Sequence, residues 1–241
     1  MENMGPSFVK STGNFIIRTS RAIFTLLNFS KTQTMISKSD IGGVIVAGGK
    51  ASRMGFRDKA LVPMHGRPLL EYIASNAENQ VENLVLNVNH NIECYKTFGL
   101  PIVPDRDASY SGPLLGILSA MHWFQNLRAD KGISYLACFP GDVPKFPQDV
   151  VSQLAKNLSK ESTAVAYIRH QDQIQPLFSL WHLGLIQQIE EAVAAGLYGP
   201  KLLFGSLKAV AVNCDDNSPG IFCNINSEED LNAAALLIDR K

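Results

Sequence analysis

The chain has 241 residues, 46% of them hydrophobic, and its 22 basic side chains balance 22 acidic ones. A formal net charge of zero provides no bulk field to attract nucleic acid, so no nucleic-acid partner is expected. The four cysteines show no C-x-x-C and no metal-ligand spacing with histidine, so we interpret them as small core residues of a reduced, cytoplasmic protein.

The first 40 residues differ in character from the rest of the chain. They hold many serines and threonines, and their acidic residues are only Glu2 and Asp40. The apolar patch at residues 22–29 is too short to span a bilayer, so no membrane partner is expected. Three interpretations are open: a targeting peptide, a disordered extension, or an upstream start codon with Met35 as the true first residue. We favour the last two and expect a leader that contributes nothing to the chemistry.

Residues 44–59 hold the pattern around which the rest of the chain is organised. The run Val44–Ala47 is apolar and rich in β-branched residues, which is typical of a strand buried on both faces. It ends at Gly48-Gly49 and passes into a loop with Arg53 and Lys59. Because glycines let backbone N–H groups approach an anion closely, this strand end predicts a polyphosphate-binding loop. Its spacing fits neither G-x-x-x-x-G-K-[ST] nor G-x-G-x-x-G.

Apolar runs and helical spacings alternate along the remaining residues. The expected strands are 84–88, 102–103, 135–139, 163–167, 176–181, 209–212 and 221–224. Pro176 is expected to be the first residue of its strand. The expected helices are 69–77, 92–98, 113–128, 149–158, 182–195, a turn or two within 199–207, and a last helix capped by Ser227. This alternation predicts an α/β fold, a single three-layer αβα, Rossmann-like domain with a mostly parallel sheet over residues 41–241.

Four residues at the ends of these elements are candidate site residues. Asn87 either caps the next turn or faces the site. Asp105 directly follows a strand, and its carboxylate could accept two adjacent N–H donors of a ligand. Gly116 costs about 1 kcal/mol in a helix compared with alanine, which close approach to a ligand and close packing explain equally well. Asp142, between two prolines, is either a ligand for Mg²⁺ or a turn residue that bonds its own backbone.

The loop also carries a resemblance to a known group of enzymes. The pattern Ala47-Gly48-Gly49-x-x-x-Arg53-Met54-Gly55-x-x-Asp58-Lys59 resembles the signature loop of nucleotidyltransferases with the nucleotide-diphospho-sugar-transferase fold. Within that group the chain is most similar to the molybdenum cofactor guanylyltransferase family. Matching segments recur in order at Asn87, Pro104-Asp105, Ser111-Gly112-Pro113-Leu114-x-Gly116, Pro140-Gly141-Asp142-x-Pro144, Gln175-Pro176-Leu177-Phe178 and Asn224-Ile225-Asn226. The likeness runs from about residue 41 to the C-terminus.

This resemblance implies an enzyme that joins GMP from GTP to the phosphate of molybdenum-loaded molybdopterin and releases pyrophosphate. It implies nucleotide contacts from Val46, Ala47, Gly48, Gly49, Lys59, Asn87, Asp105 and Asp142. The implied catalytic residues are Arg53, Lys59 and Asp142, and Asp142 is also the implied Mg²⁺ ligand. Residues expected to contact the acceptor substrate are Gly116, Asn224 and Asn226. Molybdopterin-loading proteins and molybdoenzyme chaperones are the protein partners that the resemblance suggests.

A few positions depart from the family's pattern. Val46 stands where leucine is usual, and Gly141 and Val143 replace the commoner residues around the metal aspartate. The Gly48-Gly49 pair resembles the guanylyl branch rather than the cytidylyl relatives. Two alternatives stay open: a related nucleotidyltransferase that uses CTP with molybdopterin or acts on a sugar or polyol phosphate, and a non-catalytic nucleotide-binding protein.

Overall fold

The structure, a computed structural model, describes residues 35–47, 58–107, 112–161 and 163–238. The chain divides into two units, Met1–Lys31 and Thr32–Lys241, and all the described residues belong to the second. The domain boundary that the sequence suggested at residues 40 and 41 stays a prediction. Within the described ranges, no helix is long and apolar enough to cross a membrane.

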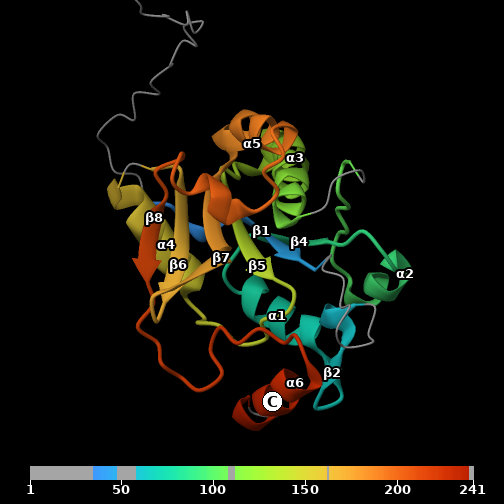
Figure 1. The fold of residues 1–241 in the computed structure, drawn as a ribbon. Helices are drawn as coiled ribbons and strands as arrows, with labels where there is room; N and C mark the ends of the chain where they lie inside the picture. Colours follow the sequence, from blue (N-terminus) through green and yellow to red (C-terminus); the bar gives the residue numbers. More distant parts are fainter. Residues whose placement is uncertain (1–34, 48–57, 108–111, 162, 239–241) are drawn as a thin grey trace, which may run out of the picture. The chain divides into compact units, whose positions relative to one another are not determined.

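The described residues form a central sheet of six strands in the order β4-β1-β5-β7-β6-β8 (Figure 1). The strands are β1 (Ile41–Val46), β4 (Asn83–Asn87), β5 (Tyr135–Pro140), β6 (Val165–His170), β7 (Gln173–His182) and β8 (Val210–Asn213). β1 is parallel to β4 and β5, and β8 is parallel to β6, whereas β7 is antiparallel to both of its neighbours. The carboxyl ends of all these strands except β7 therefore lie at one edge of the sheet.

Helices cover both faces of this sheet. On one face α1 (Leu69–Glu78) and α4 (Val150–Glu161) pack against strand residues such as Phe139. On the other face α3 (Pro113–Lys131) and α5 (Ile186–Ala194) lie side by side over residues such as Cys138 (Figure 1). Neighbouring strand residues thus enter opposite cores, as expected for a sheet buried on both faces. The predicted three-layer αβα fold with a mostly parallel sheet is confirmed.

Close packing of α3 against the sheet depends on a glycine in β1. A Cβ atom at Gly42 would lie 2.5 Å from the ring of Phe124 in α3. Any larger residue would push the helix away from the strand. The start of α3 lies near the carboxyl edge, where Gly116 packs against the side chain of Asn87 at the end of β4.

Smaller elements complete the described part of the fold. The hairpin of β2 (Pro63–Met64) and β3 (Arg67–Pro68) packs with α6 (Glu228–Leu237) in a separate apolar cluster centred on Ile225. The remaining elements are η1 (Lys38–Asp40), η2 (Lys59–Leu61), α2 (Ile92–Tyr95), η3 (Lys96–Phe98), η4 (Leu183–Leu185) and η5 (Pro200–Leu203). The C-terminal segment is therefore held beside the loop that follows Lys59.

Four expectations about strands were wrong. Pro176 lies inside β7 rather than at its start. The register of β7 against β6 shifts here, so residues 176–178 pair with no β6 residue. Proline is tolerated because its missing N–H is not needed for a hydrogen bond between the strands. β6 and β7 form a hairpin through Gln171–Asp172, both with positive φ, so strands and helices do not alternate throughout. Residues 221–224 form no strand: residues 221 and 222 lie in a turn, in which Phe222 has a left-handed φ of 54°, and residues 223 and 224 have no regular structure. Of residues 102–103, only Ile102 forms a single bridge, to Leu86.

The cysteines met the core expectation only in part. Cys138 and Cys214 are buried, whereas Cys94 and Cys223 are exposed, and all four are free thiols. Cys223 lies in the turn segment that was expected to be a strand, which explains its exposure.

Candidate active site

The carboxyl ends of β1, β4 and β5 are tied to one another by backbone hydrogen bonds. The N–H of Ala47 donates to Asn87 O at 2.9 Å, and that of Gly141 donates to Val46 O at 2.9 Å. A Cβ atom at Gly141 would lie 2.8 Å from Ala47 Cα, so only glycine lets the chain after β5 pass so close to β1. This close passage places Asp142, the next residue, near the end of β1.

The predicted site residues Gly48, Gly49 and Arg53 lie outside the described residues. Their roles in binding phosphate therefore stay predictions. Val46 and Ala47, which precede them, end β1 at the same edge as Asn87 and Asp142.

Lys59, Asp142 and Asn226 come from three separate parts of the chain and meet at this edge. Lys59 Nζ lies 3.5 Å from Asp142 Oδ2 and donates a hydrogen bond to Asn226 Oδ1. The N–H of Ile225 donates to Asp142 O at 2.9 Å, which fixes the segment before α6 against the loop after β5. The exposed fractions of the Lys59 and Asp142 side chains are 21% and 28%, so the ion pair is only partly screened by water.

The electrostatics of Asp142 reflect its position. Burial raises the pKa of its carboxyl above the ordinary value, and the nearby Lys59 ammonium opposes this shift. In the described residues no group of three histidines, cysteines or carboxylates could hold a metal by itself. A single carboxylate can nevertheless bind Mg²⁺, which keeps several waters and takes its other ligands from substrate phosphates. Asp142 is thus suited to hold Mg²⁺ together with a bound triphosphate.

A network of side-chain amides holds Asp105. Asn87 Nδ2 donates to Asp105 Oδ1 at 2.9 Å and to Val103 O at 2.9 Å. Asn89 Nδ2 donates to Asp105 Oδ2 at 2.8 Å, and the N–H of Asp105 donates to Asn89 Oδ1 at 2.7 Å. Each carboxylate oxygen keeps further lone pairs, so the fixed carboxylate can still accept two N–H groups from a ligand.

Gly116 supports this network from α3. A Cβ atom at Gly116 would lie 2.1 Å from Asn87 Oδ1, so the glycine makes room for the asparagine side chain. Close packing is sufficient to explain why glycine stands in the first turns of this helix, and contact of Gly116 with the acceptor stays a prediction. Asn224 is exposed on the segment that carries Asn226, and its role also stays a prediction.

Sequence reasoning missed Asn89 and the close approach of Gly141. Asn89 directly follows the expected strand 84–88 and was given no role. Its spacing of two from Asn87, which places both side chains on one face of an extended chain, was the available signal.

Comparison with known proteins gives concordant matches. The family model of the MobA-like NTP transferase domain matches residues 43–210. The molybdenum cofactor guanylyltransferase of Yersinia pestis (strain Pestoides F) is 34% identical over 191 residues, which are 79% of this chain and 93% of that protein. Most of the proposed site residues, including Lys59, Asn87 and Asp142, lie within the matched range of the family model.

Two solved structures share the fold. Molybdopterin-guanine dinucleotide biosynthesis protein A from Archaeoglobus fulgidus superposes with a TM-score of 0.66 at 20% identity, covering 81% of this chain and 97% of that one. A Mycobacterium tuberculosis protein solved in complex with manganese superposes with a TM-score of 0.59 at 13% identity, covering 83% of this chain and 100% of that one. At these identities the likeness concerns the fold alone.

Proposed function

The chain belongs to the MobA-like NTP transferase family, and from that membership we propose that it transfers GMP from GTP to the phosphate of molybdenum-loaded molybdopterin. It is a nucleotidyltransferase of molybdenum cofactor biosynthesis, and the proposed products are molybdopterin guanine dinucleotide and pyrophosphate. The observation that carries the proposal is the meeting of Lys59, Asp142 and Asn226 beside the end of β1.

The proposed reaction needs no general base. The acceptor phosphate is already ionised at neutral pH, and one of its oxygens forms a bond to the α-phosphorus of GTP. The bond from that phosphorus to the bridging oxygen of the leaving group breaks, and the electron pair departs with pyrophosphate. Catalysis then consists of aligning the attacking and leaving groups and of stabilising the charge on them.

The described residues can supply these functions. Lys59 contributes a partly desolvated ammonium, and Asn226 orients it through its amide oxygen. Asp142 is positioned to hold Mg²⁺, which would neutralise charge on the α-phosphate and the leaving group. Backbone donors at Gly48 and Gly49 and the charge of Arg53 complete the proposed triphosphate site.

The fixed carboxylate of Asp105 favours guanine over cytosine. Guanine presents N1–H and the N2 amino group side by side, and a carboxylate can accept from both. Cytosine instead presents hydrogen-bond acceptors at the corresponding edge, and the Asp105 oxygens would repel them. Because Asn87 and Asn89 already hold the carboxylate, it need not reorient when the base binds.

The direct test is release of pyrophosphate by the purified protein with Mg²⁺, molybdenum-loaded molybdopterin and one nucleotide at a time. GTP should support turnover that depends on the acceptor, and CTP, UTP and ATP should support little. Equal or faster turnover with CTP would assign the protein to the cytidylyl reaction instead. Binding of nucleotide without pyrophosphate release, with molybdopterin and with sugar or polyol phosphates, would indicate a non-catalytic nucleotide-binding protein.

A further inference from the structure

Two N-cap residues of short helices bond to each other instead of to their own helices. Asp58 stands at the N-cap of η2, and Asn91 stands at the N-cap of α2. Aspartate and asparagine are preferred at this position because their side chains can accept from the free N–H groups of the first turn. Yet within the described residues neither side chain caps its own helix. Asn91 Nδ2 instead donates to Asp58 Oδ2 at 2.6 Å, between positions 33 apart in the sequence.

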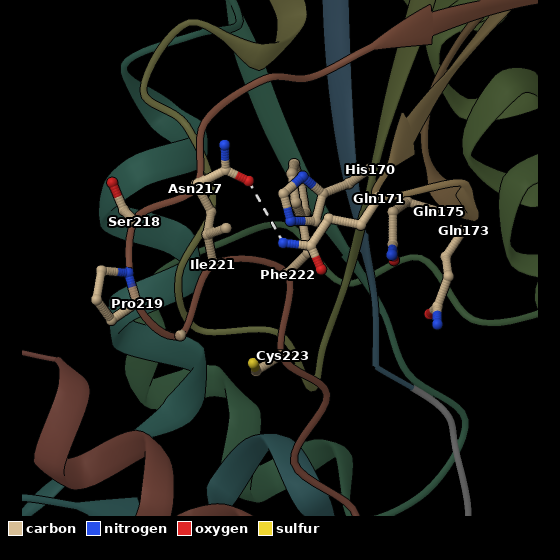
Figure 2. A pocket seen from close by; sticks show the side chains of 11 residues that line it. His170, Gln171, Gln173, Gln175, Asn217, Ser218, Pro219, Ile221, Phe222 and Cys223 are labelled. Carbon is tan, nitrogen blue, oxygen red and sulfur yellow. Dashed lines mark hydrogen bonds between the residues drawn. The ribbon is translucent and has the colours of Figure 1, made fainter.

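The hydrogen bond between Asn91 and Asp58 is of a strong kind. Another amide that joins two loops offers a comparison: Gln171 Nε2 donates to Asn217 Oδ1 at 3.4 Å beside the β6–β7 hairpin (Figure 2). That bond joins two neutral amides, whereas Asp58 offers a carboxylate. Hydrogen bonds to a carboxylate are shorter and about twice as strong as those between neutral groups. The bond from Asn91 can therefore fix the position of Asp58.

The backbone of Asn91 is itself well anchored. Its φ of 50° lies in the left-handed region, which asparagine tolerates better than most other residues. The N–H of Cys94 donates to Asn91 O at 2.9 Å at the start of α2. One turn further on, Tyr95 is fully buried in the core that α1 and α4 cover, as is Ala60 of η2. Burial raises the pKa of Tyr95 and the nearby Asp58 carboxylate adds to this shift, so Asp58 lies close to the anchored helix.

Asp58 directly precedes Lys59, the proposed catalytic lysine. The N–H of Val62 donates to Lys59 O at 3.0 Å, which closes the turn η2. The ammonium at the other end of the lysine side chain contacts Asp142 and Asn226. The position of Asp58 therefore determines where this side chain starts.

Asn91 also belongs to the segment that holds the proposed base contact. The side chains of Asn87 and Asn89 both donate to the carboxylate of Asp105. Asn91 follows Asn89 by two residues, which span at most about 7 Å. The segment after β4 thus contacts both the proposed base contact and the residue before Lys59. It connects the base end of the proposed nucleotide site to the phosphate end.

We propose that Asn91 is a positioning residue, which holds Lys59 in place through its hydrogen bond to Asp58. The base fixes one end of the nucleotide at Asp105, so the triphosphate is aligned with the Lys59 ammonium only while this hydrogen bond persists. A misplacement of about 1 Å can lower the rate of such an aligned reaction by about 10²-fold. The inference rests on the proposed function, because it concerns alignment in that reaction.

The test compares three variants of the pair. Asn91→Ala removes the donor, and Asn91→Asp places two carboxylates side by side. Each should lower kcat about tenfold or more, whereas the KM for GTP should stay the same because Asp105 keeps its contacts. Combining Asn91→Asp with Asp58→Asn restores one donor and one acceptor with the net charge of the wild-type pair. This double variant should recover most of the lost kcat.

The matched control is Asn79→Asp, which adds the same charge at the exposed asparagine at the C-cap of α1 and should change neither constant. Because Asn91 is exposed, its variants should fold. A role in stabilising α2 alone would lower the melting temperature of Asn91→Ala and leave its kcat unchanged, and this result would overturn the inference. A double variant that stays as slow as Asn91→Asp would overturn it too.

A second measurement does not require turnover. The rate at which sulfosuccinimidyl acetate acetylates Lys59 can be followed by mass spectrometry, with the exposed Lys156 as internal standard. Acetylation of Lys59 should become several-fold faster in Asn91→Ala and Asn91→Asp and return to the wild-type rate in the double variant. If GTP supports transfer and all variants behave as the wild-type protein, the inference fails while the proposed function stands. If the wild-type protein shows no transfer, the acetylation rates alone decide, and equal rates overturn the inference.

Discussion

Lys59 and Asp142 are oppositely charged and partly buried, and they lie 3.5 Å apart at the centre of the proposed site. Removing one pre-aligned group that stabilises transition-state charge commonly lowers kcat by about 10²–10³. Lys59→Ala and Asp142→Ala should each reduce GTP-dependent pyrophosphate release by at least this factor. The folded structure should persist, because a partly exposed ion pair contributes only about 0–1 kcal/mol to stability.

The control for this pair is Lys156→Ala, which removes an exposed lysine on α4 and should leave turnover unchanged. Circular dichroism spectra and thermal midpoints of all three variants should match those of the wild-type protein closely. Near-normal turnover by Lys59→Ala or Asp142→Ala would contradict the assignment of these residues to catalysis.

Asn89 offers a separate test of base recognition. It holds Asp105 through two hydrogen bonds, so Asn89→Ala should let the carboxylate rotate away from a bidentate contact. Inosine triphosphate lacks the N2 amino group and can engage only one carboxylate oxygen. The preference for GTP over inosine triphosphate in kcat/KM should therefore fall about tenfold, the scale of one hydrogen bond to a charged group.

A purely structural role for Asn89 predicts a different result. In that case kcat/KM for both nucleotides would fall by the same factor and their ratio would not change. Asn79→Ala, which removes the exposed asparagine at the C-cap of α1, is the surface control for general effects of such a substitution.

At the scale of elements, α6 holds one side of the site in place. Ser227 Oγ accepts from the N–H of Asp230 at 3.1 Å, and Asp230 Oδ2 accepts from the N–H groups of Ser227 and Asn226, both at 2.9 Å. This capping box was expected from the serine and the acids that follow it, and it is confirmed. It fixes the backbone of Asn226, whose side chain contacts Lys59.

The same contacts predict a pH dependence of stability. The hydrogen bond from the N–H of Asn226, with smaller contributions from Ser227 and Lys59, lowers the pKa of Asp230. A carboxyl group with a lowered pKa stabilises the fold above its ordinary pKa, and this contribution is lost as the pH falls through the folded value. Asp230→Ala should therefore lower the free energy of unfolding at neutral pH by about 0.3–1 kcal/mol, the usual value of a negative charge in the first turn of a helix.

Urea unfolding of the wild-type protein and Asp230→Ala over a pH series checks this expectation. The difference between the two should shrink as the pH falls below the ordinary aspartate pKa of about 3.9. A difference that stays constant across the series would mean that the ionised carboxylate does not carry the stabilisation.

At the scale of the whole molecule, the elements could be predicted from sequence but their pairing could not. A buried strand such as β5 is a short apolar run, and an amphipathic helix repeats its apolar residues with the helical period. Each kind of element can therefore be recognised from neighbouring residues alone. The reversal of β7 depends on contacts with β5 and β6 that leave no such signature. Lys59 lies 83 residues from Asp142 and 167 from Asn226, so only the family resemblance could suggest that they meet.

This long-range assembly leads to a prediction about ligand linkage. The proposed nucleotide contacts come from β1, β4, β5 and the segment before α6. A nucleotide held by all of these segments binds only the folded chain, so it must stabilise the whole domain. At a GTP concentration 100 times the dissociation constant, the unfolding free energy should rise by about 2.7 kcal/mol. In a domain of this size each kcal/mol raises the melting temperature by about 2–4 °C, so a thermal-shift assay can resolve the effect.

Thermal shifts with different nucleotides distinguish the proposed base contact at Asp105 from the proposed metal contact at Asp142. With Mg²⁺, GTP should raise the melting temperature more than CTP, UTP or ATP, because of the four bases only guanine presents two adjacent ring-edge donors, N1–H and the N2 amino group, that the two oxygens of Asp105 could accept together. Asp142→Ala should lose the Mg²⁺-dependent part of the GTP shift but keep the preference for GTP, since Asp105 is unaltered. Equal shifts with all four nucleotides would exclude base selection by Asp105, and a Mg²⁺ effect that survives in Asp142→Ala would place the metal elsewhere.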